Sequence, residues 1–412
     1  MDELDIPNFF LCPISLEIMK DPVILSTGIT YDRMSIEKWI FSGKNDTCPV
    51  TKQKLGDAEL TPNHTLRRLI QSWCTLNASY GVERIPTPRP PITKSQLMKL
   101  LNDSKSPKLQ MECLRKLKLI VSENETNKRC MEDAGASEIL ASIITTCNIA
   151  SSNANEDEFE LSRPDDEALN ILCHLQLSEK SLKSLNGEKG EFIESLMRLM
   201  QCDNYQSRTY SVILLKSILK VADPLQKTVL KRELFVELVQ LLRDQISSKA
   251  SKAALQLLIN ICAVGRNRIK AVEAGAVSVM IDFLCDHSSQ KRVCEMVLVV
   301  LDQLCQCAEG RAELLNHGAG LAVVSKKILR VSQLASEKAV KILLSIAKFS
   351  ATSPNVLQEM LHLGVVGKLC LVLQMDCGEK IKDRAAEILK LHARAWKNTS
   401  CLPTNLRTSY PS

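Results

Sequence analysis

Apolar residues recur every three or four positions through most of the chain beyond about residue 96. Seven stretches share this pattern and an aliphatic texture: ECLRKLKLIV, EALNILCHL, SVILLKSIL, ALQLLINIC, MVLVVLDQLC, AVKILLSIA and AEILKLHA. Each places apolar side chains at i, i+3, i+4 and i+7, the spacing of an amphipathic helix whose apolar face is covered by a neighbour. We therefore expect equivalent helices stacked in six to seven units, the last one capping the stack near Trp396.

Small residues mark regular steps between these helices. Four steps contain a glycine beside an alanine or valine, at residues 133–136, 273–276, 317–320 and 363–366. The intervals from Gly275 to Gly318 and from Gly318 to Gly364 are 43 and 46 residues. A period in the low forties with two or three helices per unit is typical of armadillo or HEAT solenoids. Glycine at such a step either relieves a helix C-terminus or lets two helices approach closely.

The first eighty residues have a different character. They hold seven of the sixteen aromatic residues of the chain. Residues 22–32 alternate β-branched and turn residues and predict a hairpin, residues 34–42 predict a helix ended by Gly43, and Asn63 predicts the cap of a second helix. We therefore expect a small α+β domain followed by an all-α superhelical solenoid, in a chain that is mostly α.

A proline-rich connector separates the two parts. Four prolines fall in six positions of the sequence IPTPRPPI, which forbids a helix and favours an extended, stiff segment. The predicted organisation is a first domain at 5–79, a linker at 80–95, repeats at 96–396 and a flexible tail at 397–412. A polar, acidic insertion interrupts the repeats at about 147–166.

Composition narrows the class of protein. With 45% hydrophobic and 24% charged residues, the chain can bury a large core. The net charge of +6 is spread thinly, which argues against a nucleic-acid partner, and the absence of a long apolar run argues against an integral membrane segment. Sixteen cysteines form no C-x-x-C pair, and the acidic start MDELDIPNFF resembles no signal peptide. We expect a cytoplasmic location, with the nucleus as a further compartment.

Two short motifs carry the candidate chemistry, namely Cys12-Pro13-Ile14-Ser15 and Cys48-Pro49-Val50-Thr51. A zinc-binding RING domain would carry a second cysteine in each motif, because tetrahedral zinc needs paired thiolate or imidazole ligands. Ser15 and Thr51 occupy those positions instead. Besides Cys12 and Cys48, the first eighty residues offer only Cys74 and His64 as thiolate or imidazole ligands for zinc. The sequence therefore predicts no metal site and no cofactor.

Polar side chains must then hold the two loops. The predicted network consists of Glu17, Asp32, Arg33 and Asn63. Residues 6–79, from IPNFFLCPISLEIMKDPVILSTGITYDRMSIEKWI to LTPNHTLRRLIQSWC, resemble a U-box, the zinc-free relative of the RING domain. With the repeats, the whole chain resembles the plant U-box armadillo ubiquitin ligases, in particular the branch associated with stress and immune signalling.

The resemblance implies a function and a site. Such a ligase binds a ubiquitin-conjugating enzyme that carries ubiquitin, recruits protein substrates on its repeats, and forms no covalent intermediate itself; homodimers are also expected. The implied contact residues are Cys12, Pro13, Ile14, Trp39, Pro49 and Val50. The implied ubiquitin-positioning donor is Lys52, where many relatives have Arg. A lysine offers a point charge and not a planar fork.

Each of these roles has a structural alternative. Ile14 could belong to the core and Pro49 could be an ordinary turn residue, whereas Ile36 and Ile40 are the better core pair on the helix of Trp39. Cys12 and Cys48 could pack beneath their loops. Thr61 and Thr87 each precede proline and are candidate phosphorylation sites. Two other functions lack their sequence features: a covalent ubiquitin acceptor would need an activating Cys–His pair, and a nuclear-import carrier would need tryptophans in the central repeats.

A non-catalytic adaptor is the main alternative to a ligase. In that case the first domain would serve only for docking or dimerisation. Lys52 would then be inadequate as a ubiquitin-positioning donor. A reconstituted ubiquitination assay separates the two classes.

Overall fold

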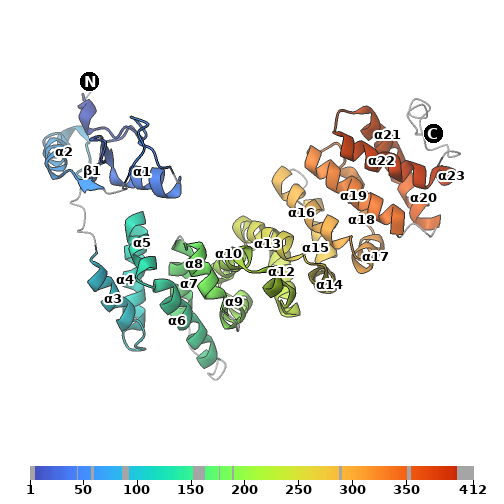
Figure 1. Cartoon of the computed structure of the whole chain (residues 1–412), viewed down its shortest axis with the longest axis horizontal. Coiled ribbons are helices and arrows are strands. Elements are labelled where there is room, and N and C mark those ends of the chain that lie inside the picture. Colours follow the sequence, from blue (N-terminus) through green and yellow to red (C-terminus); the bar gives the residue numbers. More distant parts are fainter. Residues whose placement is uncertain are drawn as a thin grey trace. The chain divides into compact units, whose positions relative to one another are not determined.

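We describe a computed structural model of the chain (Figure 1). It describes residues 5–43, 45–56, 60–85, 92–151, 163–175, 177–187, 190–286, 290–349 and 354–396. The chain divides into two compact units, Met1–Ser181 and Leu182–Ser412. Helices dominate both, which confirms the predicted mostly-α class.

The first eighty residues form a small three-stranded domain at the start of the first unit. Its elements are η1 (Asn8–Phe10), β1 (Pro22–Ile24), β2 (Thr30–Asp32), α1 (Arg33–Glu37), the π-helical turn η2 (Lys38–Ser42), β3 (Thr61–Pro62), α2 (His64–Leu76) and η3 (Ala78–Tyr80). The antiparallel sheet has the order β2-β1-β3, with Val23 opposite both Tyr31 and Pro62. The hairpin was predicted, whereas β3 was not, because a two-residue strand containing proline leaves no alternating pattern.

Local signals account for the predicted hairpin and helix. Gly28 lies at φ 81° between β1 and β2, and its amide donates to the Leu25 carbonyl at 2.8 Å. Glycine adopts this left-handed conformation without a steric penalty. At the start of α2, the Asn63 Oδ1 atom accepts a hydrogen bond from the Leu66 amide at 3.1 Å. Both elements are therefore confirmed.

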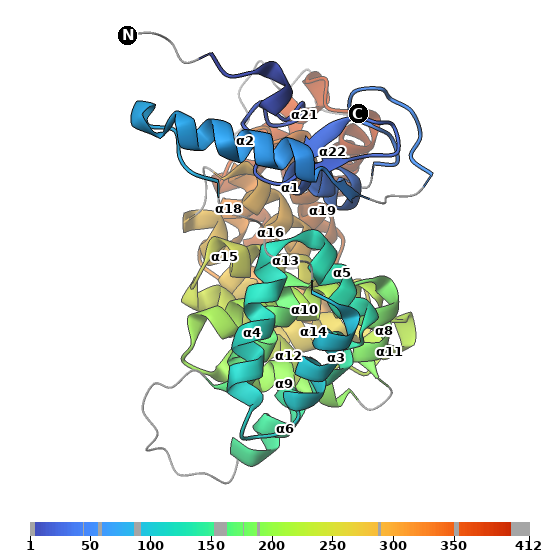
Figure 2. The ribbon, with the colours of Figure 1, turned by 90° about the vertical axis from the view of Figure 1, so that its left-hand side faces the viewer.

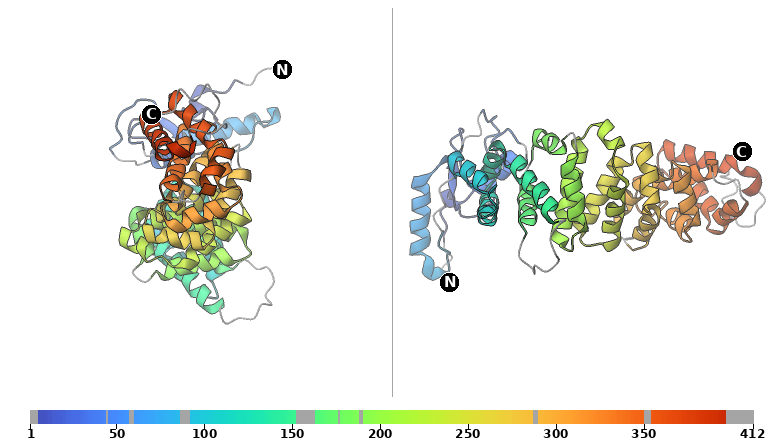
Figure 3. Two further views of the ribbon diagram at one scale, coloured as in Figure 1. Left: turned by 90° about the vertical axis from the view of Figure 1, so that its right-hand side faces the viewer. Right: turned by 90° about the horizontal axis from the view of Figure 1, so that it is seen from below.

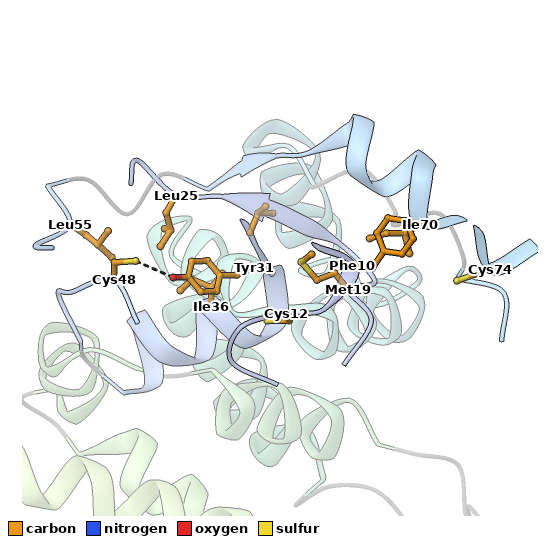
Figure 4. Packing of buried hydrophobic residues seen from close by; sticks show 11 residues of the cluster. Phe10, Cys12, Met19, Leu25, Tyr31, Ile36, Cys48, Leu55, Ile70 and Cys74 are labelled. Atoms are coloured by element: carbon orange, nitrogen blue, oxygen red, sulfur yellow. Dashed lines mark hydrogen bonds between the residues drawn. The ribbon is translucent and has the colours of Figure 1, made fainter. Parts of the chain in front are cut away.

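The core of this domain joins the sheet to its helices. Buried side chains of the cluster come from η1, both loops, β1, β2, α1 and α2 (Figure 4); they include Phe10, Cys12, Met19, Val23, Tyr31, Ile36, Cys48 and Ile70. Ile36 is buried and Ile40 is half-buried against the cluster, as expected for the core-facing pair. The two loop cysteines thus form part of the hydrophobic core.

Further helices of the first unit begin the repeats. They are α3 (Lys94–Asp103), α4 (Gln110–Glu123), α5 (Glu125–Asp133), α6 (Ala136–Ser151) and α7 (Pro164–His174), while α8 (Glu179–Asn186) crosses into the second unit. Helix α4 packs against α3, α5 and α7. Figure 2 labels α3, α4 and α5. Of the predicted insertion, residues 152–162 lie outside the described residues, as does the predicted tail.

Both ends of the predicted insertion are helical. Helix α6 continues to Ser151, and α7 already begins at Pro164. Proline is favoured in the first turn of a helix, and the acidic residues Asp165, Asp166 and Glu167 that follow suit the positive end of its dipole. Acidic residues are typical of surface loops, but in the first turn of a helix they also mark its start.

The second unit is a stack of helices that can be followed by colour from green to red in Figure 3. It contains α9 (Glu191–Gln201), α10 (Tyr205–Val221), α11 (Pro224–Thr228), α12 (Arg232–Asp244), α13 (Ser248–Ile261), α14 (Gly265–Glu273), α15 (Ala276–Asp286), α16 (Lys291–Leu304), α17 (Ala308–Asn316), α18 (Gly320–Lys326), α19 (Gln333–Phe349), α20 (Pro354–His362), α21 (Val365–Gln374), α22 (Glu379–Leu391) and α23 (Ala393–Trp396). Helices α10, α13, α16, α19 and α22 pack in sequence, each against the next. With α4 and α7 they are the seven helices expected from the sequence.

The glycine steps use both of the expected mechanisms. Gly135, Gly275 and Gly364 have φ between 69° and 85° and end α5, α14 and α20 in the left-handed conformation. Gly320 acts differently. A Cβ atom there would lie 2.0 Å from the Leu314 carbonyl oxygen, so this glycine allows α17 and α18 to pack closely.

Among the described residues, no single helix is long and apolar enough to cross a membrane. Helices α20 and α21 meet the length and composition criteria only together, across a bend of 62°.

Gly320→Ala tests the close approach of α17 and α18. We expect it to lower the thermal unfolding midpoint, because overpacking of this kind costs about 1–3 kcal/mol. Gly318→Ala is the matched control, since a Cβ atom at Gly318 would meet no atom within 4 Å. Circular dichroism of both variants measures the difference; equal midpoints would contradict the close-approach role.

Candidate functional site

The two motif loops share one backbone structure. In the first, the Cys12 amide donates to the Glu17 carbonyl and the Leu16 amide donates to the Cys12 carbonyl, both at 2.8 Å. In the second, Cys48 and Lys52 repeat these bonds at 2.8 and 3.0 Å, with Gln53 in the place of Glu17. Leu16 and Lys52 both have positive φ, 59° and 60°. The repeated Cys-Pro motif therefore encodes one turn used twice.

The first loop is tied to the sheet through Asp32. Its backbone amide donates to the Cys12 Sγ atom at 3.3 Å. Its Oδ1 atom accepts from the backbone amides of Lys20 and Asp21 at 2.8 and 3.0 Å. One residue of β2 thus contacts the first loop and the segment that leads from it into β1.

The remaining network residues connect the sheet to the helices. Arg33 Nε lies 2.6 Å from Asp21 Oδ2, a half-exposed ion pair of the kind that contributes about 1 kcal/mol or less. The Asn63 amide donates to the Pro22 carbonyl at 2.8 Å, and its Nδ2 atom lies 3.4 Å from the Thr30 hydroxyl. Of the predicted network, Asp32 contacts the first loop, whereas Arg33 and Asn63 join the sheet to the helices.

Glu17 requires a correction. Its carbonyl accepts from Cys12, but its side chain is exposed, and within the described residues its carboxylate takes no part in the network. The sequence reading assigned the side chain a role that its backbone performs.

The second loop is held by Tyr31. Its hydroxyl lies 3.0 Å from the Cys48 Sγ atom, which also accepts from the Thr27 hydroxyl at 3.4 Å (Figure 4). The Val50 amide donates to the Tyr31 hydroxyl at 3.4 Å. This buried phenol therefore contacts both the base and the tip of the loop.

Hydrogen bonds to Cys48 favour its thiolate. Burial raises the pKa of the Cys48 thiol, but hydrogen bonds from Thr27, Thr51 and Tyr31 outweigh burial and lower the pKa to about 6. Burial, followed by the bond to Cys48, raises the pKa of Tyr31 above its ordinary value, so its hydroxyl stays protonated as a donor. The Tyr31–Cys48 contact is therefore a charge-assisted hydrogen bond at neutral pH.

Trp39 lies between the helix and the second loop. Its Nε1 atom donates to the Thr47 carbonyl at 2.9 Å, and its own carbonyl accepts from Asn45 Nδ2 at 3.0 Å. The Lys52 Nζ atom lies 5.9 Å from the centre of the Trp39 ring. The indole is half-buried, so it supports the loop with one edge while part of the ring remains accessible.

The loop tips present an apolar surface. Pro13 is exposed, Val50 is 52% exposed, and Ile14 and Pro49 are half-buried. Ile14 packs partly against the core, so its structural alternative holds for one side of the side chain. Cys12 is fully buried, which corrects its place among the contact residues: it supports the loop from beneath.

Leu16 is a surface residue that sequence reasoning missed. It is 74% exposed on the first loop, two residues after Ile14. The sequence motif carries no signal for this role, because it reveals neither the positive φ of Leu16 nor its exposure.

Glu37 is a second residue that was missed. It is fully buried, and its carboxylate accepts from the Thr126 hydroxyl at 2.7 Å and from the Glu125 amide at 3.1 Å. A carboxylate at the first turn of α5 suits the helix dipole. Nearby, the Arg129 guanidinium lies 3.6 Å from the centre of the Phe41 ring. The two hydrogen bonds, together with the Arg33 guanidinium 3.8 Å from Glu37 Oε1, satisfy a charge that would otherwise be costly to bury.

Other candidate chemistry can be placed as well. Cys12, Cys48 and Cys74 are each at most 1% exposed. Within the part of the chain that the structure describes, no group of three or more His, Cys, Asp or Glu side chains could hold a metal ion. Thr61 is exposed in β3, whereas Thr87 lies outside the described residues.

Comparisons with known proteins agree with this architecture. The family model of the U-box domain matches residues 6–79, and that of the plant U-box protein ARM repeat region matches residues 96–412. E3 ubiquitin-protein ligase PUB23 of Arabidopsis thaliana is 61% identical over 415 residues, covering 100% of this chain and 98% of the relative. E3 ubiquitin-protein ligase PUB22 of the same plant is 58% identical over 433 residues, covering 100% and 99%.

A solved engineered protein, Northeast Structural Genomics Consortium target OR497, is similar at a TM-score of 0.46 and 16% identity, covering 77% of this chain and 87% of that chain. This similarity is too low to carry an argument.

The chain belongs to the plant U-box proteins with an armadillo-repeat region. Within that family it is a U-box ubiquitin-protein ligase, a transferase that forms no covalent ubiquitin intermediate on itself. The burial of all three U-box cysteines fits this class, because a covalent acceptor must be reachable.

The pKa of Cys48 provides a test of the second loop. We expect the thiolate absorbance difference between wild type and Cys48→Ala to titrate near pH 6, below the value of about 8.5 for an unfolded thiol. Since the folded pKa is lowered, the associated stability is fully present above about pH 8.5 and is lost as pH falls through 6. Hydrogen exchange of the U-box amides measures this loss of stability with falling pH. Cys74→Ala, which removes a different buried thiol, is the control. A titration at 8.5 or above would contradict the hydrogen-bonded thiolate.

Proposed function

We propose that the U-box binds a ubiquitin-charged conjugating enzyme through the tips of its two loops. The observation that carries the proposal is the shared turn, which presents Pro13, Ile14 and Val50 as apolar groups on a fixed backbone beside Trp39. A small apolar surface of this kind, supported by a rigid base, suits a transient protein interface. Leu16 extends the proposed surface on the first loop.

Ubiquitin transfer then proceeds by positioning. The ligase supplies no nucleophile; it holds the thioester-linked ubiquitin so that a substrate lysine attacks in a productive geometry. Lys52 is the proposed donor that bridges enzyme and ubiquitin. Its positive φ reverses the chain at the end of the loop, and its exposed side chain lies near Trp39. A backbone held in this sparsely populated region is common at functional sites.

The repeats are proposed to recruit the protein substrate. Stacked helices offer a continuous surface for extended segments or helices of a partner. The proposed setting is stress or immune signalling in the plant cytoplasm, with the nucleus as a further compartment, on the strength of the family resemblance. A plant that lacks this protein should show an altered stress response. Return of the normal response when the wild-type protein is restored would support a role in stress or immune signalling.

Homodimerisation is proposed through α2. Leu69 and Leu76 are exposed and lie seven residues apart, on one face of the helix. Exposed leucines at this spacing suit packing against a second copy. Sedimentation of wild type and of Leu69→Glu/Leu76→Glu would measure the association.

Ile14→Ala with Val50→Asp tests the docking surface. We expect this pair to weaken conjugating-enzyme binding by at least about tenfold, since central apolar contacts dominate such interfaces. Ubiquitin-chain formation with activating enzyme, conjugating enzyme and ATP should fall in parallel. Met34→Ala, which removes an exposed side chain on α1, is the control. Unchanged chain formation in the pair would favour the adaptor alternative.

Lys52→Ala tests the positioning role separately. We expect slower discharge of ubiquitin from the conjugating enzyme with little change in binding, and faster discharge for Lys52→Arg, which restores the planar fork. Lys54→Ala is the matched control because Lys54 is exposed and pairs with Asp46 at 3.6 Å. Equal discharge rates for all four proteins would remove Lys52 from the mechanism.

A further inference from the structure

Two neighbouring helices of the second unit carry basic residues without acidic ones. Of the seven equivalent helices, only α10 and α13 contain no Asp or Glu. They pack against each other. Their basic residues are Arg208, Lys216 and Lys220 on α10, and Lys249 and Lys252 on α13.

Arg208 has an acidic partner, whereas the lysines do not. The Arg208 guanidinium pairs with Asp244 at the end of α12 at 2.5 Å. Within the described residues, no carboxylate lies within ion-pair distance of Lys216, Lys220 or Lys252, which we call the lysine cluster. Lys216 is half-buried, and the other two are exposed.

Later helices of the same row show a different arrangement. Lys338 and Lys341 of α19 both pair with Asp302 of α16, at 3.2 and 2.9 Å. Arg384 of α22 pairs with Glu337 of α19 at 3.0 Å. Ion pairs thus join α16 to α19 and α19 to α22, whereas among the described residues none joins α10 to α13.

The members of the lysine cluster act on one another. Burial, followed by the positive charges of Lys220 and Lys252, lowers the pKa of Lys216. Like charges held together in this way destabilise the empty surface and attract an anionic group. A carboxylate placed among them would replace repulsion with charge-assisted hydrogen bonds.

We propose that the lysine cluster binds an acidic segment of the protein substrate. This inference rests on the proposed recruitment function of the repeats and specifies its chemistry: Asp or Glu side chains of the substrate lie between α10 and α13. The extent of the cluster favours a short peptide over a nucleic acid. The next helix in the row, α16, carries the half-buried Glu295, whose carboxylate would repel a continuing phosphate backbone.

The proposal is tested by binding a fluorescent peptide of alternating Glu and Ser to the full chain. Charge reversal in Lys216→Glu/Lys252→Glu should weaken binding by at least about tenfold, because it replaces attraction with repulsion at the site. The matched control is Lys380→Glu/Lys390→Glu, which makes the same change in net charge on exposed residues of α22. The control should bind like wild type, and added salt should weaken wild-type binding.

Three results would overturn the proposal. The first is the absence of peptide binding to wild type. The second is an equal loss of peptide affinity in the Lys380→Glu/Lys390→Glu control, which would indicate an effect of net charge alone. The third is tighter binding of a single-stranded oligonucleotide than of the peptide. Chain formation with the conjugating enzyme, measured on wild type, tests the ligase mechanism separately from peptide binding. A wild-type chain that binds the peptide but forms no ubiquitin chains would refute the ligase mechanism and leave the acidic-segment site standing.

Discussion

Two adjacent residues of β2 hold both loops of the U-box. Tyr31 contacts the sulfur of Cys48 through its hydroxyl. Asp32 contacts the sulfur of Cys12 through its amide, while its carboxylate accepts hydrogen bonds from two further amides. A strand is a suitable anchor because successive side chains point to opposite faces. Tyr31 enters the core, whereas Asp32 reaches the loop edge. In a RING domain, bound zinc holds the corresponding loops in place. Here hydrogen bonds from one short strand hold them.

The repeats depend on a comparable set of polar bridges between successive helices. Asn260 donates to the Leu219 carbonyl at 3.0 Å, Gln303 donates to the Ile259 carbonyl at 3.0 Å, and the His392 ring lies 2.9 Å from the Ala347 carbonyl. Each bridge joins a helix of the row to its predecessor. Aliphatic packing supplies most of the stabilisation, and these bonds fix which helix faces which. A surface with this fixed register can present charges, such as the lysine cluster, at defined positions.

Sequence reasoning succeeded where one local rule decides the structure. The hairpin, the Asn63 cap and the amphipathic helices follow from turn chemistry, capping and periodicity. It failed where the structure depends on contacts far apart in the chain. The strand β3 exists only because it pairs with β1, and the burial of Glu37 depends on α5, whose first residues lie almost ninety positions away. The roles of Cys12 and Glu17 were likewise set by the backbone of the loop, which residue types do not reveal.

The hydroxyl of Tyr31 offers the most direct test of the account. Tyr31→Phe removes that single group and keeps the aromatic ring in the core. The account predicts weaker conjugating-enzyme binding and slower ubiquitin-chain formation, since a hydrogen bond to a charged group contributes about 1.5–3 kcal/mol, while the helical signal of the chain stays unchanged. Binding and chain formation at the wild-type level in Tyr31→Phe would contradict the claim that this strand holds the docking loops in place.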